Sequence, residues 1–226
     1  RLRQRIVFTE GDHPTMLKAA AQCIQEGICF PVLLGRSHEI AAAKEALGLD
    51  FTCEEIDPRE DPRRRGVYME QLQKKRGRKG ITLPDARRLL KSRVWFGSMM
   101  VEMGDADGII GGISRDYPEF LKPCLATIGM DENAHRVVGT YMMTIKGQLM
   151  FISDATINIY PDARTLAEIA VQTARVARRF GIEPRVALLS FSNFGSSSQY
   201  RSERIEDSLE MARELDPSLI IDGPMQ

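Results

Sequence analysis

The sequence predicts an α/β protein with a mostly parallel sheet and helices on both faces of that sheet. Two observations predict this class. Short apolar runs alternate with amphipathic helical patterns, and glycine-containing loops follow several of the apolar runs. The pattern restarts near residue 136, and 226 residues are enough for two small domains. We therefore expect a first α/β lobe at 1–135 and a second at 136–226.

The first lobe is expected to begin with a strand, a helix between Pro14 and Gly27, and a second strand. Proline suits the first helical turn, and glycine ends helices. Thr82 and Asp85 have the spacing of a capping box at the start of a long helix, which Gly104 is expected to end. The strands expected here are 5–9, 28–34 and the short buried run 106–112. The helices expected after Gly27 are 38–47, 66–75, 82–103 and 120–128.

The second lobe is expected to open with a hairpin, because strands at 137–144 and 149–155 are joined across Lys146 and Gly147. A stripe of apolar residues that includes Ile169, Ala170 and Phe180 then predicts a long helix from Asp162. A strand at 185–191, a helix at 203–215 and a strand at 219–222 follow. The chain stops just after this last strand, so we expect the second lobe to be C-terminally incomplete.

Composition is that of an ordinary soluble globular chain, with 43% apolar and 27% charged residues. No apolar run is long enough to cross a bilayer and no secretory signal opens the chain, so we expect a cytoplasmic protein without a membrane partner. The four cysteines lack C-x-x-C spacing, and there are three histidines. We therefore expect reduced core cysteines and no metal site.

Charge is unevenly distributed, although 31 basic residues balance 31 acidic ones. Residues 58–93 carry 13 Lys or Arg and 4 Asp or Glu. Such a segment can attract phosphate, a nucleotide or nucleic acid, or it can be a solvated helix face. Near it, only Tyr68 and Trp95 supply the aromatic rings that single-stranded nucleic acid would need, so we expect no nucleic-acid partner.

Three loops that follow predicted strands are candidate ligand loops: 10–12, 111–115 and 192–198. Carboxyl ends of parallel strands meet at one edge of a sheet, where open α/β proteins bind ligands. The alternative for each loop is a tight strand-to-helix turn. None matches a dinucleotide or ATP motif. The candidate loop residues are Gly111, Gly112, Ser192, Asn193, Gly195 and Ser196. The candidate anion-contacting cations are Arg76, Arg78, Lys79, Arg115 and Lys122.

Catalytic groups are harder to recognise from the sequence, because no Ser-His-Asp set stands out. Asp107 and Asp154 lie at the edges of predicted strands. Either could act as a base, or could form a turn or capping hydrogen bond.

Several motifs, taken in order, resemble the phosphate acetyltransferase/butyryltransferase family: TEGD, RGRKGITLPDA, ADGIIGG, LKPCLATIG and the long block DATINIYPDARTLAEIAVQTARVARRFGIEPRVALLSFS. The resemblance runs from Arg5 to the end of the chain. It implies two α/β/α domains facing a cleft, in a fold related to isocitrate dehydrogenase. It also implies transfer of an acetyl group between phosphate and coenzyme A.

The resemblance places Arg76 where the family has a phosphate-contacting arginine. Lys122 falls where the family usually has arginine, and a point charge there replaces a bidentate fork. The catalytic arginine–aspartate pair and the coenzyme A-contacting serine of the family fall beyond residue 226, so the resemblance identifies no catalytic residue in this chain.

The loop Ser192-Asn193-Phe194 resembles the transferase-like domain fused behind the catalytic part of bacterial NADP-dependent malic enzymes. This implies a domain that binds acetyl-CoA or coenzyme A, regulates oxidative decarboxylation of malate to pyruvate, and helps to assemble a homodimer or higher homo-oligomer. NADP and a divalent metal would then bind only an N-terminal part absent from this chain. The competing hypothesis is a working phosphate acetyltransferase. The sequence does not distinguish the preferred acyl chain or the oligomer number.

Overall fold

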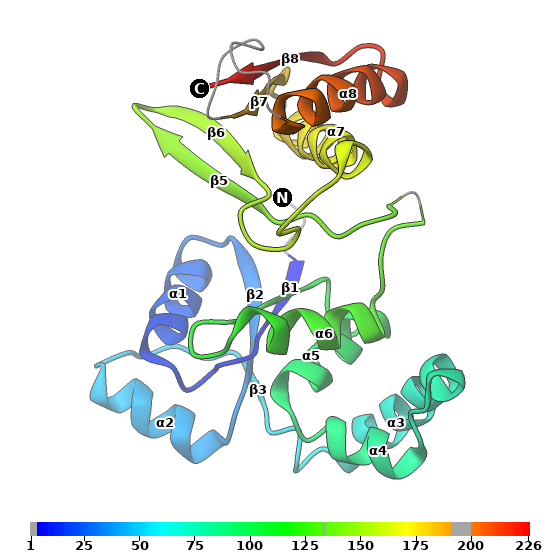
Figure 1. The fold of residues 1–226 in the computed structure, drawn as a ribbon. Helices are drawn as coiled ribbons and strands as arrows, with labels where there is room; N and C mark the ends of the chain where they lie inside the picture. The colour runs from blue at the N-terminus through cyan, green and yellow to red at the C-terminus, as the bar shows by residue number, and fades with distance from the viewer. Residues whose placement is uncertain (1–3, 133, 191–199) are drawn as a thin grey trace. The chain divides into compact units, whose positions relative to one another are not determined.

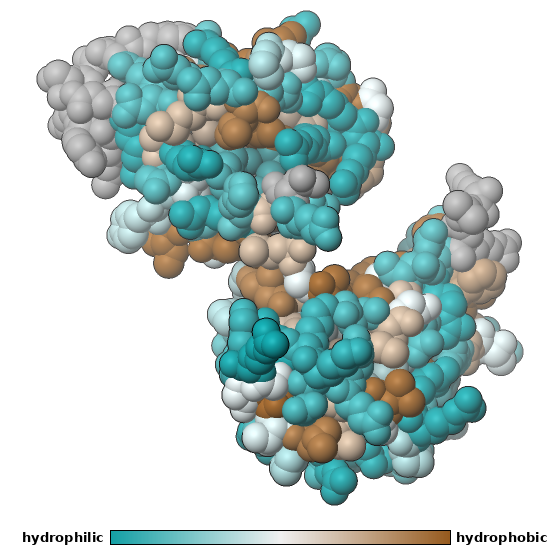
Figure 2. Space-filling model, turned by 90° about the vertical axis from the view of Figure 1, so that its right-hand side faces the viewer, coloured by the Kyte–Doolittle hydropathy of each residue, from teal (hydrophilic) through white to brown (hydrophobic). Residues whose placement is uncertain are grey.

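The computed structural model describes residues 4–132, 134–190 and 200–226, with side chains from 204 in the last range. The chain divides into two compact units, Arg1–Gly129 and Met130–Gln226 (Figure 1). The first unit thus ends a few residues before the boundary expected after residue 135. In each unit, the face visible in Figure 2 is mostly hydrophilic, interrupted by separate hydrophobic patches.

Unit 1 is built on a four-stranded parallel sheet with the strand order β3-β2-β1-β4. Its strands are β1 (Gln4–Phe8), β2 (Cys29–Leu34), β3 (Glu54–Ile56) and β4 (Gly108–Ile110). Both neighbours of β1 run parallel to it, in registers that pair Val7 with Val32 and with Ile109. The predicted parallel sheet is therefore confirmed.

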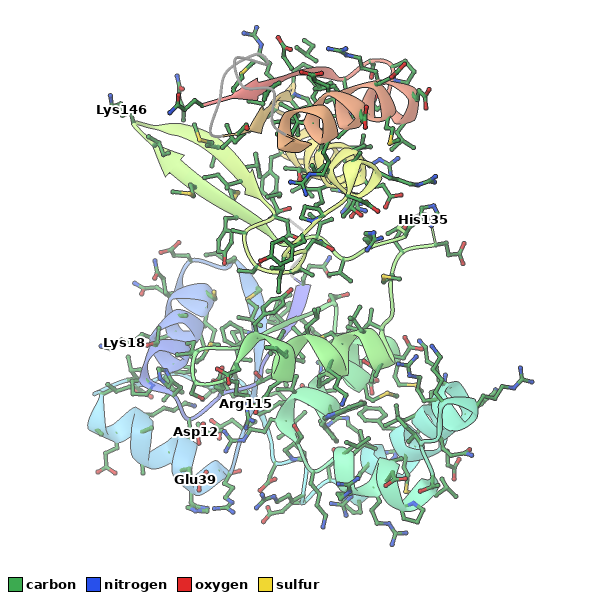
Figure 3. The ribbon with its side chains drawn as sticks, viewed as in Figure 1. Asp12, Lys18, Glu39, Arg115, His135 and Lys146 are labelled. Carbon is green, nitrogen blue, oxygen red and sulfur yellow. The ribbon has the colours of Figure 1, made fainter. Side chains whose placement is uncertain are left out.

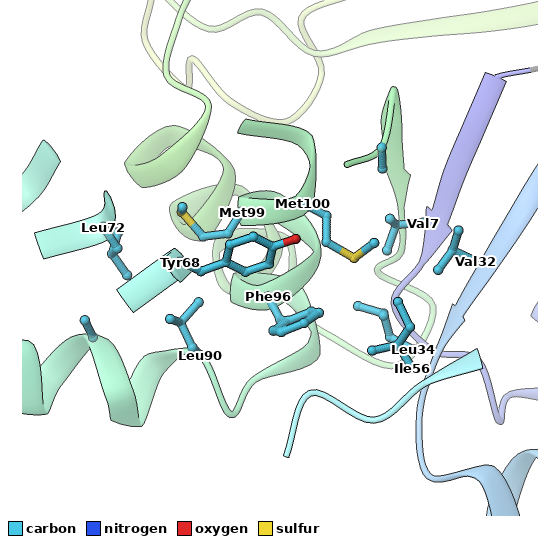
Figure 4. Close-up of a cluster of buried hydrophobic side chains, with 12 residues drawn as sticks. Val7, Val32, Leu34, Ile56, Tyr68, Leu72, Leu90, Phe96, Met99 and Met100 are labelled. Atoms are coloured by element: carbon cyan, nitrogen blue, oxygen red, sulfur yellow. The ribbon is translucent and has the colours of Figure 1, made fainter. Parts of the chain in front are cut away.

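Helices cover both faces of this sheet. Successive strand residues point to opposite faces, so the sheet contributes to two separate buried clusters. Phe8 and Leu33 pack in one buried cluster with residues of α1 (Pro14–Gln25) and α2 (Ser37–Ala46). Val7, Val32 and Leu34 belong to a separate cluster with Tyr68, Leu72, Leu90, Phe96, Met99 and Met100 on the other face (Figure 4). The remaining helices of unit 1 are α3 (Pro62–Arg76), the 3₁₀ turn η1 (Gly77–Lys79), α4 (Leu83–Leu89), α5 (Arg93–Glu102) and α6 (Tyr117–Thr127).

The single helix predicted at 82–103 is wrong, because the structure has two helices there. α4 ends at Leu89, and α5 begins at Arg93 after Ser92 adopts an extended conformation with ψ 130°. Serine is a favoured N-cap residue, so a new helix can start at this point. The break places Leu90 and Val94 in buried positions on either side of the turn. The capping box at Thr82 and Asp85 is present as predicted.

Two other expectations for unit 1 need correction. The run 106–112 is not a buried strand throughout, because β4 spans only Gly108–Ile110 at the end of the sheet order and Ile110 is 47% exposed. The helix expected at 66–75 begins at Pro62 instead, because Asp61 caps it by accepting from the backbone N–H of Arg64.

Unit 2 contains the predicted hairpin. β5 (Thr140–Ile145) pairs antiparallel with β6 (Gln148–Ser153), and Lys146 and Gly147 form the turn with φ of 50° and 79°. Two positive φ values match the twist of a two-residue hairpin turn. Apolar side chains are exposed on both strands of this ribbon, among them Met142 at 53%.

The rest of unit 2 pairs two helices with two parallel strands, β7 (Arg185–Leu189) and β8 (Ile220–Met225). α7 (Ala163–Arg179) and α8 (Tyr200–Leu215) share a buried cluster with these strands that includes Ala170, Leu209 and Ile221. Phe180 was expected on the buried stripe of α7. Instead it lies just past the end of the helix, 55% exposed, against the ring of Phe151.

Candidate functional site

The carboxyl ends of β1 and β4 form the point in unit 1 where an open α/β sheet usually binds its ligand. After β1 the chain adds β2 and β3 on one side of it, and later adds β4 on the other side. The direction of strand addition therefore reverses between β1 and β4. The predicted loops 10–12 and 111–115 meet here, as the sequence suggested. The third predicted loop, 192–198, lies outside the described residues, and so do Ser192, Asn193, Gly195 and Ser196.

Glu10 occupies this point, and the residue is 5% exposed. It accepts hydrogen bonds from the backbone N–H groups of Gly112 (2.8 Å), Ile113 (2.9 Å) and Ser114 (2.7 Å), and from the Ser114 hydroxyl. Burial alone would raise the pKa of Glu10, but the Ser114 hydroxyl and the backbone donors outweigh it and lower the pKa to about 2. A nest of N–H groups that could hold an anion is therefore filled by a side chain of the same unit.

Arg93 ties the loop after β1 to the start of α2. Its guanidinium donates to both carboxylate oxygens of Asp12, at 2.5 and 3.1 Å, and to Glu39 at 3.3 Å. Figure 3 labels Asp12, Glu39 and Arg115 in this part of unit 1. Burial would raise the pKa of Asp12, but the hydrogen bonds and charge of Arg93 lower it below its usual value. Arg36 also pairs with Glu39, at 2.7 Å. These ion pairs fix two arginines at the carboxyl edge of the sheet.

A polar cavity of about 550 Å³ opens beside these pairs. That volume is in the range of small-molecule sites. The residues that line it are Arg36, Glu39, Asp57, Pro58, Arg59, Lys91, Ser92, Arg93 and Arg115. Of the cations predicted to contact an anion, only Arg115 is in this lining.

The two cations singled out by resemblance lie on neighbouring helices. Arg76 is the last residue of α3, half-buried, and Lys122 lies exposed on α6; these two helices are in contact. Neither forms an ion pair with a described residue, whereas Lys75 pairs with Glu102 at 2.6 Å. Their positive charge therefore remains available to an anion.

The predicted glycines of the 111–115 loop have structural reasons to be glycine. A Cβ on Gly111 would overlap the Thr9 hydroxyl and the ring of Phe120. Gly112 has φ +94°, a conformation that other residues rarely adopt, and its N–H is already used by Glu10. Binding of a ligand by these glycines stays a prediction.

Both aspartates that were candidate bases accept hydrogen bonds from backbone N–H groups. Asp107 accepts from the backbone N–H of Arg5 at 2.7 Å. Asp154 accepts from the backbone N–H groups of Thr156, Ile157 and Asn158, which lowers its pKa although burial opposes this. The turn-forming alternative therefore describes Asp154, whereas Asp107 binds a backbone N–H that is 102 positions away in the chain. No group of three or more His, Cys, Asp or Glu in the described ranges is arranged to hold a metal ion.

Sequence reasoning missed Glu10 and Arg93 as organising residues. Glu10 and its donors are about a hundred positions apart in the chain, and single-sequence periodicity carries no signal for such a contact. Arg93 follows the helix break at Ser92, which was not predicted. The available signal was an acidic residue directly after a strand in the TEGD motif.

These features define a class: an α/β protein with a parallel sheet whose carboxyl edge is rich in cations. The model of the phosphate acetyl/butaryl transferase family matches residues 1–226, so the chain belongs to this family. The phosphate acetyltransferase of Corynebacterium glutamicum is 37% identical over 222 residues, which are 98% of this chain and 67% of that protein. The NADP-dependent malic enzyme of Escherichia coli is 36% identical over 227 residues, 98% of this chain but 30% of that protein.

Solved structures agree with this family. A phosphotransacetylase from Streptococcus pyogenes superposes with a TM-score of 0.89 at 33% identity, covering 99% of this chain and 68% of that one. The chain spans about a third of the length of some relatives, such as the Salmonella typhimurium phosphate acetyltransferase (31%). None of the described helices combines the length and the apolar character needed to cross a bilayer.

Proposed function

We propose that this chain binds acyl-coenzyme A and phosphate, and that it acts as the acetyl-CoA-sensing domain of an NADP-dependent malic enzyme. The observation that carries ligand binding is the family match along all 226 residues. Arg76 and Lys122 support it, because both cations lack an ion pair with a described residue and are free to face a phosphate group.

Regulation rather than turnover is favoured by two departures from the family pattern. Lys122 offers one movable charge where the family usually has an arginine fork, which holds a transferring phosphate less firmly. The sequence of the Asn193-Phe194 loop resembles that of the malic-enzyme subgroup, and the Escherichia coli malic enzyme is among the relatives. In this hypothesis NADP, a divalent metal and the chemistry on malate belong to a different part of the protein, and the protein assembles as a homo-oligomer.

The second candidate function is acetyl transfer itself, which the phosphate acetyltransferases among the relatives favour. The coenzyme A sulfur would attack the carbonyl carbon of acetyl phosphate, the carbon–oxygen bond to phosphate would break, and the thiol proton would leave with the phosphate. Arg76 and Lys122 would stabilise the charge on the departing phosphate.

Two assays on the full-length protein separate these functions. The regulatory function predicts that acetyl-CoA changes the rate of malate-dependent NADPH formation, while coenzyme A and acetyl phosphate give thioester at the background rate. Thioester formation that Arg76→Ala abolishes and Arg63→Ala, a change at an exposed arginine of the same helix, spares would instead establish the transferase. Failure of both activities in a folded protein would exclude both functions.

A further inference from the structure

A second cationic site lies in unit 1, and its lining includes neither Arg76 nor Lys122. It is the cavity of about 550 Å³ at the carboxyl edge of the sheet. Loops that follow β2, β3 and β4 border it, together with the turn between α4 and α5. Five basic and two acidic side chains line it, which leaves a formal excess of three positive charges.

The basic side chains fall into two groups. Arg93 and Arg36 are held by Asp12 and Glu39, so their charges are largely compensated and they form a fixed wall. Arg59 and Lys91 are exposed and form no ion pair with a described residue. The third cation on this side is Arg115, which pairs with Glu119 on α6 at 3.6 Å; both side chains are exposed.

The lining of the cavity favours a negatively charged ligand. Among the described residues that line the cavity, none has an aromatic ring and Pro58 is the one apolar residue, so this lining offers no surface for stacking a base or burying an acyl chain. Arg59, Lys91 and Arg115 come from three separate segments and can surround an anion with several oxygens, and arginine forks match phosphate oxygens in pairs. We propose that this cavity binds the diphosphate group of a small metabolite, as a site separate from Arg76 and Lys122.

The proposal does not rest on the proposed function. Its ligand chemistry has three sources: free pyrophosphate, a nucleoside diphosphate, or the diphosphate of a coenzyme A-type molecule. Competition by ADP and by coenzyme A against bound pyrophosphate identifies the source. Competition by either supports binding of a diphosphate that is part of a larger ligand, and competition by neither supports pyrophosphate itself.

The test is calorimetric titration of the full-length protein with pyrophosphate. The Arg59→Ala/Lys91→Ala double variant is expected to weaken binding by at least about tenfold, because two charge-assisted contacts are lost. The matched control is Arg63→Ala/Arg87→Ala, which removes the same charge from two exposed arginines outside the cavity lining. The control is expected to stay within about twofold of the unmodified protein, because neither side chain lines the cavity and exposed charges are screened by salt.

Three results would overturn the proposal: no saturable binding by the unmodified protein, equal weakening by both double variants, or loss of binding in Arg76→Ala with none in the cavity variant. The last result would assign pyrophosphate to the predicted phosphate site, so the proposed function would survive while this inference failed. Urea unfolding checks each variant, and the single change Lys91→Gln replaces the double variant if that one does not fold.

Discussion

Glu10 lies beneath the loop at 112–114 and accepts four hydrogen bonds there, three from backbone N–H groups and one from Ser114. An ionised carboxylate in this position joins the end of β1 to the segment that follows β4. The same segment carries Arg115 to the cavity. One buried charge therefore orders a stretch of backbone that contributes to the candidate site.

Replacing this charge gives the first prediction. Glu10→Gln should lower the free energy of unfolding at pH 7 by about 2 to 3 kcal/mol. The donors now bind two carboxylate oxygens, whereas an amide offers them one acceptor oxygen. The pKa of Glu10 is lower in the folded protein, about 2 against an ordinary value of 4.5. Its contribution is therefore complete above about pH 4.5 and is lost as the pH falls toward 2.

Urea unfolding across pH 2 to 7 measures this difference. Glu60→Gln is the control, because Glu60 is an exposed carboxylate in the loop after β3. The account of Glu10 is wrong if the two variants unfold at the same urea concentration at pH 7.

Gly111 gives a prediction about packing. Gly111→Ala should lower the free energy of unfolding by about 1 to 3 kcal/mol, because its Cβ would overlap Thr9 and Phe120. Gly66→Ala in α3 meets no atom within 4 Å and should raise stability by about 0.5 to 1 kcal/mol. Thermal unfolding of the two variants should move the midpoint in opposite directions, and a shift of the same sign would contradict this packing.

α4 and α5 show how local signals set helix boundaries. α4 starts with a reciprocal capping box: the Thr82 hydroxyl accepts from the backbone N–H of Asp85, and the Asp85 carboxylate accepts from the backbone N–H of Thr82. α5 starts at Arg93, and the side chain of its N-cap residue, Ser92, makes no capping hydrogen bond. Thr82 and Ser92 are both N-cap residues, but only the side chain of Thr82 stabilises its helix through a capping hydrogen bond.

Thr82→Ala should cost about 1 kcal/mol of stability, because it leaves a helix N–H without its acceptor. Ser92→Ala should change stability by less than about 0.5 kcal/mol, since no capping bond is lost. Chemical denaturation of both variants gives the comparison. An equal loss in the two variants would show that the capping box adds nothing to α4.

Across the whole chain, the elements with a clear period or turn signal were predicted and the others were not. Short apolar runs identified β1 and β2, and the Lys146-Gly147 dipeptide identified the hairpin of unit 2. β3 has only three residues, two of them Glu54 and Glu55, so it shows no apolar run to recognise.

The site was less predictable than the fold, because its contacts join distant parts of the chain. Arg93 reaches Asp12 across 81 positions, and the helix break that presents Arg93 depends on packing in the core as well as on Ser92. The loops at 10–12 and 111–115 were nevertheless expected to meet, because parallel strands end at the same edge. What the sequence could not indicate is that a glutamate of the first loop would satisfy the N–H groups of the second.

Calorimetric titration of the full-length protein with acetyl-CoA tests the central claim, that this chain retains the ligand of its family. We predict saturable binding that unmodified coenzyme A competes for, because both molecules present the same phosphates to the protein. A folded protein that gives no binding heat with acetyl-CoA at any temperature tested, and whose stability acetyl-CoA does not raise, would contradict the claim.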